Sequence, residues 1–123
     1  WCALDDVTIE NGTVYLLPHS RGGTRGKIID HIQDPQINDL IGYQGDDPGD
    51  PVIIPAGSIA AFSSFNFHRS GPNTSPNFRR VYLPQYSCEP IYNSQTGELW
   101  DSAVPFVKSG EIVYDPKTDL PEM

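Results

Sequence analysis

Turn-forming residues interrupt this chain so often that short strands are favoured over long helices. The sequence of 123 residues holds twelve prolines and eleven glycines. Proline lacks a backbone N–H and glycine favours turns, so both residue types end regular elements. Several of the short segments between them are rich in β-branched and aromatic residues, which is typical of strands. The pattern predicts an all-β fold.

The composition sets the class of protein. Hydrophobic residues make up 37% of the chain and charged residues 20%, which indicates one globular domain at most. The net charge of −8 argues against binding to nucleic acid, whose phosphates would repel such a surface. The same charge disfavours anionic membranes, and no apolar run approaches the length of a transmembrane helix.

Two cysteines, Cys2 and Cys88, bear on the compartment. One pair cannot define a disulfide scaffold, so two free thiols in a reducing environment are the preferred interpretation. No signal peptide is visible. We therefore expect a cytoplasmic location, although a missing N-terminal segment would remove a targeting signal.

The N-terminal segment predicts a hairpin. Trp1–Ile9 and Thr13–Leu17 have strand-like composition, and Asn11-Gly12 stands between them. Both turn residues tolerate positive φ, which a tight hairpin turn requires.

The next segment, Pro18–Lys27, is predicted to be a loop. It carries three of the eight basic residues, namely Arg21, Arg25 and Lys27. Such clustering in an acidic chain fits either an anionic substrate group or a solvated loop. The solvated loop is the preferred interpretation.

Two further segments show weaker patterns. Residues Ile28–Gly42 are weakly helical until Pro35, so a short helical turn or an excursion between strands is expected. Tyr43–Pro51 is an acidic, turn-rich loop. Its aspartates lack the spacing and closing glutamate of an EF-hand, which favours a surface loop over a calcium site.

Strands are expected at Val52–Ile54 and Ser58–Phe67, on either side of a tight turn at Pro55–Gly57. The second of these strands leads into His68. A neutral imidazole at this place is a good ligand for a transition metal. The alternative is a histidine that only caps the strand.

The segment His68–Tyr86 has a turn-rich centre, so we expect its two strands to double back on each other. That pairing would bring His68 close to Arg79. Arg79 is predicted to share a strand face with Val81 and Leu83, which is unusual for an arginine without an acidic partner. Its guanidinium suits a carboxylate, while Arg80 is expected to be exposed.

This segment resembles the third-ligand motif of the phytanoyl-CoA dioxygenase family. The family pattern is a histidine, a small residue, Ser-Gly-x-Asn and then an arginine on the next strand. The matching residues here are His68, Arg69, Ser70, Gly71, Pro72, Asn73 and, further on, Arg79. Arg69 departs from the pattern, since it stands where the family has a small residue.

The N-terminal segment resembles the preceding block of the same family. That block has a tryptophan, an Asn-Gly turn and a Pro-x-Ser strand end. The corresponding residues are Trp1, Asn11, Gly12, Pro18 and Ser20. The two blocks stand in the family's order and together cover roughly half of the chain, so their combination is more specific than either block alone.

The resemblance implies a double-stranded β-helix, or cupin-like jelly roll, that uses iron(II) and 2-oxoglutarate. His68 would be an iron ligand, and Arg79, Ser70 and Trp1 would bind the cosubstrate. No catalytic residue is expected beyond the metal ligands. The alternatives are a structural ion pair for Arg79, a loop hydroxyl for Ser70 and a core aromatic for Trp1.

The family takes its first two iron ligands from a His-x-Asp/Glu motif, and this chain lacks one. Neither His19 nor His31 has an acid two residues later. We therefore expect residues 1–123 to be the C-terminal part of one jelly-roll domain, incomplete at its N-terminus, with 88–123 as a capping segment.

The implied function is hydroxylation of an unactivated C–H bond in a small organic substrate by a dioxygenase. The 123 residues alone are expected to be inactive, and the oligomeric state is left open. One alternative is an inactive jelly-roll binding module. Another is a cupin-type isomerase or sugar-binding protein, which Arg79 disfavours because it suits a dicarboxylate.

Overall fold

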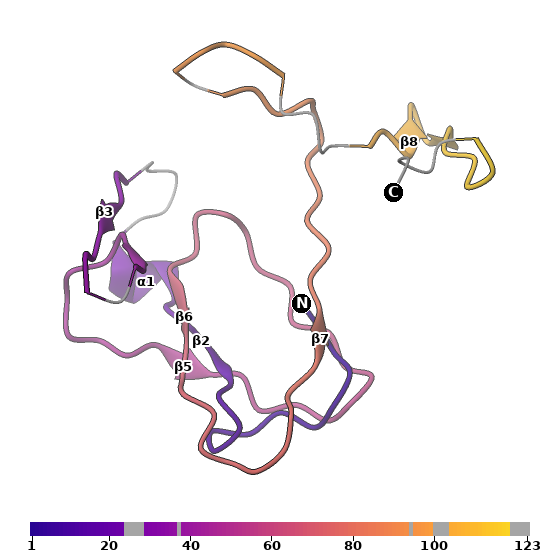
Figure 1. Ribbon diagram of the computed structural model, residues 1–123. Coiled ribbons are helices and arrows are strands. Elements are labelled where there is room, and N and C mark those ends of the chain that lie inside the picture. The colour runs from indigo at the N-terminus through magenta and orange to yellow at the C-terminus, as the bar shows by residue number, and fades with distance from the viewer. Residues whose placement is uncertain (24–28, 37, 94, 100–103, 119–123) are drawn as a thin grey trace. The chain divides into compact units, whose positions relative to one another are not determined.

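The computed structural model describes residues 1–23, 29–36, 38–93, 95–99 and 104–118 of the chain (Figure 1). The chain divides into two compact units, Trp1–Pro84 and Gln85–Met123. In chain order, the elements are β1 (Cys2–Ala3), β2 (Val14–Leu16), α1 (His19–Gly22), β3 (Ile32–Gln33), β4 (Leu40–Ile41), β5 (Asp50–Pro51), β6 (His68–Ser70), β7 (Val81–Tyr82), β8 (Val107–Lys108) and β9 (Glu111–Ile112).

These strands form small antiparallel sheets with the neighbours β1-β7, β5-β2-β6, β3-β4 and β8-β9. Helix in the described residues is limited to the four residues of α1. The all-β prediction is thereby confirmed. The jelly-roll arrangement of these strands stays a prediction.

One register joins residues 1–17, the N-terminal arm, to residues 67–83, the second arm. The pairs run from Cys2–Tyr82 through Asn11–Asn73 to Leu16–His68. Each step forward along the N-terminal arm is matched by one step back along the second arm. The two arms are therefore joined at both ends, by β1 with β7 and by β2 with β6, and bridged once more at Asn11 and Asn73.

The N-terminal arm has a second neighbour on its other side. β5 pairs with β2 through Tyr15 and Pro51, and Val7 forms a bridge with Ile54. Flanked on both sides, the N-terminal arm supplies the core. Its buried residues are Ala3, Val7, Thr13, Val14 and Leu17.

The predicted hairpin at Asn11-Gly12 is wrong, although the turn itself forms. Gly12 has a φ of 82° and its N–H donates to the carbonyl of Ile9 at 3.1 Å. The strands before and after the turn pair with distant segments instead of with each other. A Cβ at Gly12 would lie 2.7 Å from the carbonyl oxygen of Gly71, so glycine also permits the close approach of the second arm.

The expectation that His68–Tyr86 doubles back is also wrong. β6 pairs with β2, and β7 pairs with β1, because both strands find partners in the N-terminal arm. The side chain of Asn73 holds the intervening loop: its amide donates to the carbonyl of Asn77 at 2.8 Å. The loop is tied to the N-terminal arm by the N–H of Thr74, which donates to Glu10.

The predicted strand Ser58–Phe67 does not form. Its final part is a turn in which the N–H of Asn66 donates to the carbonyl of Ser63 at 3.0 Å. Serine and asparagine side chains compete with strand ladders in this way. The Pro55–Gly57 turn is confirmed, with the N–H of Ser58 donating to Pro55 and a φ of 84° at Gly57. The strand expected at Val52–Ile54 lies slightly earlier, at β5.

Three further segments can be compared with the predictions. The loop predicted at Pro18–Lys27 contains α1. Of the two alternatives for Ile28–Gly42, the excursion between strands is the one that forms, as the β3–β4 hairpin, and not the helical turn. The predicted strand Arg79–Tyr86 is reduced to β7. Pro84 ends it, since proline cannot donate to a ladder.

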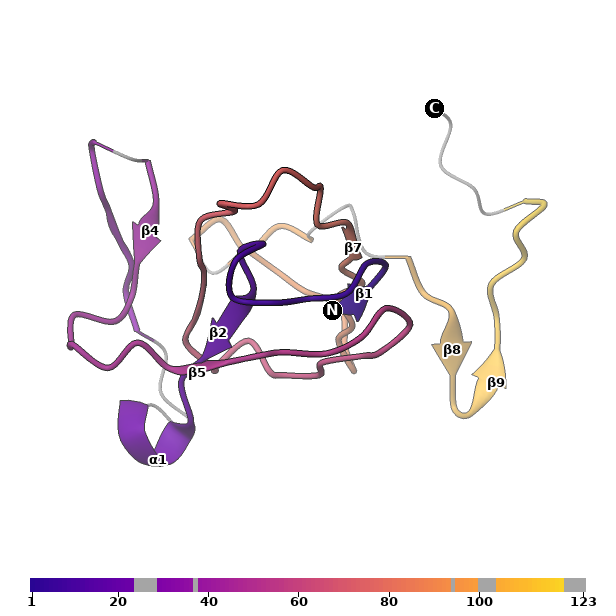
Figure 2. The ribbon, with the colours of Figure 1, turned by 90° about the horizontal axis from the view of Figure 1, so that it is seen from below.

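The second unit is built from local pairs. β8 and β9 form a hairpin, which Figure 2 shows as two neighbouring arrows. Tyr92 forms a bridge with Leu99. The composition of Ser94–Gly97 predicts a turn between them, and the N–H of Gly97 donates to the carbonyl of Asn93 there. Ser94 itself lies outside the described residues. The capping role of 88–123 stays a prediction.

Cys2 and Cys88 are both free thiols. Across the described part of the chain, no helix has the length and apolar character needed to span a membrane.

Candidate functional site

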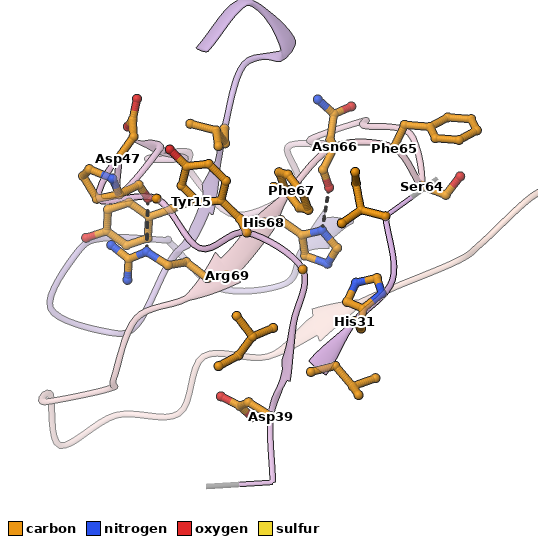
Figure 3. A pocket seen from close by; sticks show the side chains of 18 of the residues that line it. Tyr15, His31, Asp39, Asp47, Ser64, Phe65, Asn66, Phe67, His68 and Arg69 are labelled. Atoms are coloured by element: carbon orange, nitrogen blue, oxygen red, sulfur yellow. Dashed lines mark hydrogen bonds between the residues drawn. The ribbon is translucent and has the colours of Figure 1, made fainter. Parts of the chain in front are cut away.

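A cavity of about 950 Å³ lies beside the His68 end of the second arm (Figure 3). Three segments form it: the end of β2, the β3–β4 hairpin with the loop that follows it, and the residues that lead into β6. Its lining is Tyr15, Leu17, Ile29, His31, Asp39–Tyr43, Gly45–Pro48 and Ser64–Arg69.

The imidazole of His68 has a fixed orientation in this cavity. Its Nδ1 lies 3.1 Å from the backbone carbonyl oxygen of Asn66. A carbonyl only accepts hydrogen bonds, so Nδ1 carries a hydrogen, and in the neutral ring Nε2 keeps its lone pair. The ring of Phe62 packs against the imidazole, with 5.0 Å between the ring centres. The exposed His68 ring thus offers a free Nε2 as an acceptor or metal ligand.

The turn before β6 sets the position of the Asn66 carbonyl. The side-chain oxygen of Asn66 accepts hydrogen bonds from the N–H and the hydroxyl of Ser63, both at 3.1 Å. The sequence Ser63-Ser-Phe-Asn66 therefore holds the imidazole two residues later. Sequence reasoning missed this role, because it assigned the segment to a strand.

His31 is a second histidine of the cavity lining. It stands just before β3, and a Cβ added at Gly42 would lie 3.0 Å from its Nε2. An iron centre of the expected kind needs three protein donors. The described residues bring together no group of three histidine, cysteine or acidic side chains.

Arg79 and Trp1 lie together at the other end of the arms. The guanidinium of Arg79 is 5.4 Å from the centre of the Trp1 ring. Its Nε donates to the backbone carbonyl of Asn11 at 3.2 Å, and the residue is half-buried. Among the described residues, no acid forms an ion pair with Arg79.

The structure does not join all four predicted site residues in one contact. His68 lines the cavity, whereas Arg79, Trp1 and Ser70 are not part of its lining. Ser70 is exposed at the end of β6, opposite Val14. Asn11, the partner of Arg79, and Leu16, the partner of His68, are five residues apart, which is up to roughly 17 Å of extended chain.

The acidic partner that Arg79 lacks belongs to its neighbour, Arg80. Arg80 is exposed, as expected, and its guanidinium lies 2.6 Å from Asp5. Asp5 also accepts a hydrogen bond from the backbone N–H of Arg80. These hydrogen bonds lower the pKa of Asp5 from 3.8 to about 2. Asp5 thus fastens the two arms together.

The basic loop after β2 is partly neutralised within the chain. Arg21 forms ion pairs with Asp47 at 2.8 Å and with Asp50 at 3.0 Å. The hydrogen bond to Asp50 raises the pKa of Arg21, and the N–H of Gly49 lowers the pKa of Asp47. These ion pairs engage two of the aspartates that were considered as calcium ligands. Arg25 and Lys27 lie outside the described residues.

Arg69 is a cavity residue that sequence reasoning missed. Its guanidinium lies 4.1 Å from the centre of the Tyr15 ring, and Tyr15 is its cross-strand partner. Its Nε donates to the backbone carbonyl of Pro48 at 3.1 Å. The available signal was its departure from the small residue of the family motif.

Comparison with known proteins gives one match. A family model described as phytanoyl-CoA dioxygenase matches residues 1–81 of the chain. The matched range ends just before the boundary between the two units, and it contains Trp1, His68, Ser70 and Arg79. No curated protein and no solved structure matches the chain.

Proposed function

Because the chain belongs to the phytanoyl-CoA dioxygenase family, we propose that it is part of an iron(II)- and 2-oxoglutarate-dependent oxygenase. The reaction would hydroxylate an unactivated C–H bond of a small organic substrate. When bound, iron supplies the oxidising chemistry, while the protein supplies ligands, orientation and exclusion of side reactions. The family is one of dioxygenases; the activity of this chain is the proposal.

The observation that carries the proposal is the hydrogen bonding of the His68 imidazole. Its Nδ1–H is bonded to the Asn66 carbonyl, and its Nε2 is free on a residue that lines the cavity. Metal-binding histidines commonly donate their other ring N–H to a carbonyl or carboxylate, which fixes the tautomer. In the proposal, Nε2 of His68 is one of three iron ligands.

Arg79 is proposed as the anchor for the distal carboxylate of 2-oxoglutarate. Its Nε is engaged by the Asn11 carbonyl, which leaves the two terminal amino groups for a bidentate contact. The Trp1 ring beside the guanidinium would line the cosubstrate site. Ser70 would donate a hydrogen bond to the same carboxylate.

Two iron ligands are still needed, and the chain contains no His-x-Asp/Glu motif. We assign them to a segment that precedes Trp1 in the complete protein. In this proposal, residues 1–123 are the C-terminal part of a jelly-roll domain, and 88–123 cap it. Closure of the roll around both arms would turn His68 and Arg79 toward a common cosubstrate.

The decisive experiment measures succinate formation from 2-oxoglutarate by the complete protein, with and without added iron(II). We expect activity only with iron, and loss of at least 100-fold in His68→Ala, which removes a metal ligand. His31→Ala is the matched control, because His31 lines the same cavity, and it should keep most of the activity. Unchanged succinate formation in His68→Ala would refute the assignment.

A second measurement tests Arg79. Arg79→Ala should raise the KM for 2-oxoglutarate at least tenfold, because the distal carboxylate loses a charged bidentate partner. Arg80→Ala is the control on the neighbouring residue, whose partner is Asp5. Equal KM values in the two variants would remove Arg79 from the cosubstrate site.

A metal-free binding module is the second candidate. It is favoured by the donor set, since the described residues group no three potential ligands. Succinate formation that needs iron(II) would exclude it. Ligand binding without any iron-dependent turnover of the complete protein would support it.

A further inference from the structure

Arg69 carries a positive charge that the fold holds in place from two sides. The face of its guanidinium lies 4.1 Å from the centre of the Tyr15 ring, and its Nε donates to the Pro48 carbonyl at 3.1 Å. Its backbone belongs to β6, which is paired to β2. A guanidinium fixed in this way loses little conformational freedom when it binds a ligand.

Two of the three acids beside Pro48 are already engaged by another arginine, and the third, Asp46, forms no ion pair with Arg69 among the described residues. Asp47 and Asp50 both pair with Arg21, so they are not ion-pair partners of Arg69. The terminal amino groups of Arg69 have no bonded partner among the described residues. Within a chain of net charge −8, this is a cation whose bidentate edge is still open.

The rest of the cavity is largely apolar and aromatic. Tyr43 and Phe67 pack together there, with 5.3 Å between their ring centres. Aliphatic side chains complete the lining, namely Leu17, Ile29, Leu40 and Ile41. A pocket of this kind takes an apolar body and orients it through a small number of polar groups.

We propose that Arg69 binds the carboxylate of an apolar substrate whose body lies in the 950 Å³ cavity. This inference rests on the proposed function and names the substrate class of that same site. Figure 3 shows the guanidinium of Arg69 pointing away from the imidazoles of His68 and His31. Both residues nevertheless belong to the lining of the same cavity. In the proposal, the substrate lies along this lining, with its carboxylate at Arg69 and its other end toward His68.

The cavity also contains the carboxylates of Asp39 and Asp46, which repel an anion and would attract a cation. The charge of the ligand that binds most tightly therefore shows whether Arg69 or these two carboxylates dominate binding in the cavity. We compare three probes that share one skeleton: 3-phenylpropanoate, 3-phenylpropan-1-ol and 3-phenylpropylammonium. Their dissociation constants are measured by titration calorimetry on the complete protein, without iron and without 2-oxoglutarate.

We expect the carboxylate to bind at least tenfold more tightly than the alcohol, and the ammonium to bind most weakly. Arg69→Gln should abolish the advantage of the carboxylate and leave alcohol binding unchanged, which also shows that the variant is folded. Arg69→Lys should recover only part of the advantage, because lysine lacks the planar fork. Arg80→Gln is the matched control and should bind like the wild type.

Equal binding of carboxylate and alcohol by the wild type would overturn the proposal. So would tighter binding of the ammonium, or an unchanged carboxylate affinity in Arg69→Gln. Because the titration needs neither iron nor 2-oxoglutarate, its outcome is separate from succinate formation. A failure of the proposed oxygenase activity would leave carboxylate binding intact, and loss of carboxylate binding would leave succinate formation intact.

Discussion

The two units of this chain are stabilised in different ways. In Trp1–Pro84, the strands that supply the core pair with partners tens of residues away, whereas β3 and β4 form a local hairpin, and all the buried residues of the described chain belong to this unit. In Gln85–Met123, β8 pairs with the next strand, β9, and every described residue is exposed or half-exposed.

The unit with distant strand pairing is also the unit that contains the candidate site. The family match covers residues 1–81 and therefore lies within the first unit. His68 and Arg79 are positioned there through the N-terminal arm, at Leu16 and Asn11. Changes in the first unit should therefore alter global stability, whereas changes in the second should remain local.

The largest effect is expected for Gly12→Ala. Alanine at a φ of 82° is strained, and its Cβ would lie 2.7 Å from the carbonyl oxygen of Gly71. We expect a loss of about 3–5 kcal/mol in the free energy of unfolding, measured by urea denaturation.

Gly110→Ala in the second unit is the matched control. Gly110 also has a positive φ, of 85°, but a Cβ there meets no atom within 4 Å. Only the backbone strain remains, so a loss of about 1 kcal/mol is expected. If both variants lost the same free energy, the proposed contrast between the units would fail.

A smaller effect is expected where Asp5 joins the arms. The folded-state pKa of Asp5 is about 2, below its ordinary value of 3.8, because Arg80 stabilises the carboxylate. This contribution to stability is fully present above pH 3.8 and is lost as the pH falls through about 2. Asp5→Asn should therefore lower the thermal midpoint at pH 5, with little difference from the wild type near pH 2.

The ion pair of Asp5 is exposed, so added salt should also reduce the difference in thermal midpoint. Asp6→Asn is a control for the general loss of one negative charge. A difference between wild type and Asp5→Asn that stayed constant from pH 5 to pH 2 would contradict this role of Arg80.

The smallest effect is expected for Ile112→Ala in β9. The side chain is 80% exposed, so its removal uncovers little apolar surface. We expect a change within about 0.5 kcal/mol in the free energy of unfolding of the protein. A loss above 2 kcal/mol would show that the second unit also contributes to the core.

The sequence predicted the turns better than it predicted which strands pair. The turns at Asn11-Gly12, Pro55–Gly57 and Asn73 follow from the φ preferences and short side chains of their own residues. The strand partners were wrong in both predicted hairpins. Local composition does not encode whether a strand pairs with its neighbour or with a segment dozens of residues away.

The candidate site was predictable only in part. His68 and Arg79 were found because a family motif marks them, but the motif says nothing of what orients them. The Asn66 carbonyl and the Asn11 carbonyl do so through backbone contacts that only coordinates reveal. Arg69 was passed over because it departs from the motif, and that departure now marks the proposed substrate contact.

The paired ends of the two arms constrain how this protein can evolve. Because Cys2 faces Tyr82 and Leu16 faces His68 within ladders, one residue inserted inside a ladder in a single arm would turn the side chains beyond it to the opposite face. A change of length in either segment therefore needs a compensating change in its partner. Relatives of this chain should gain or lose residues in the two arms together, or in neither.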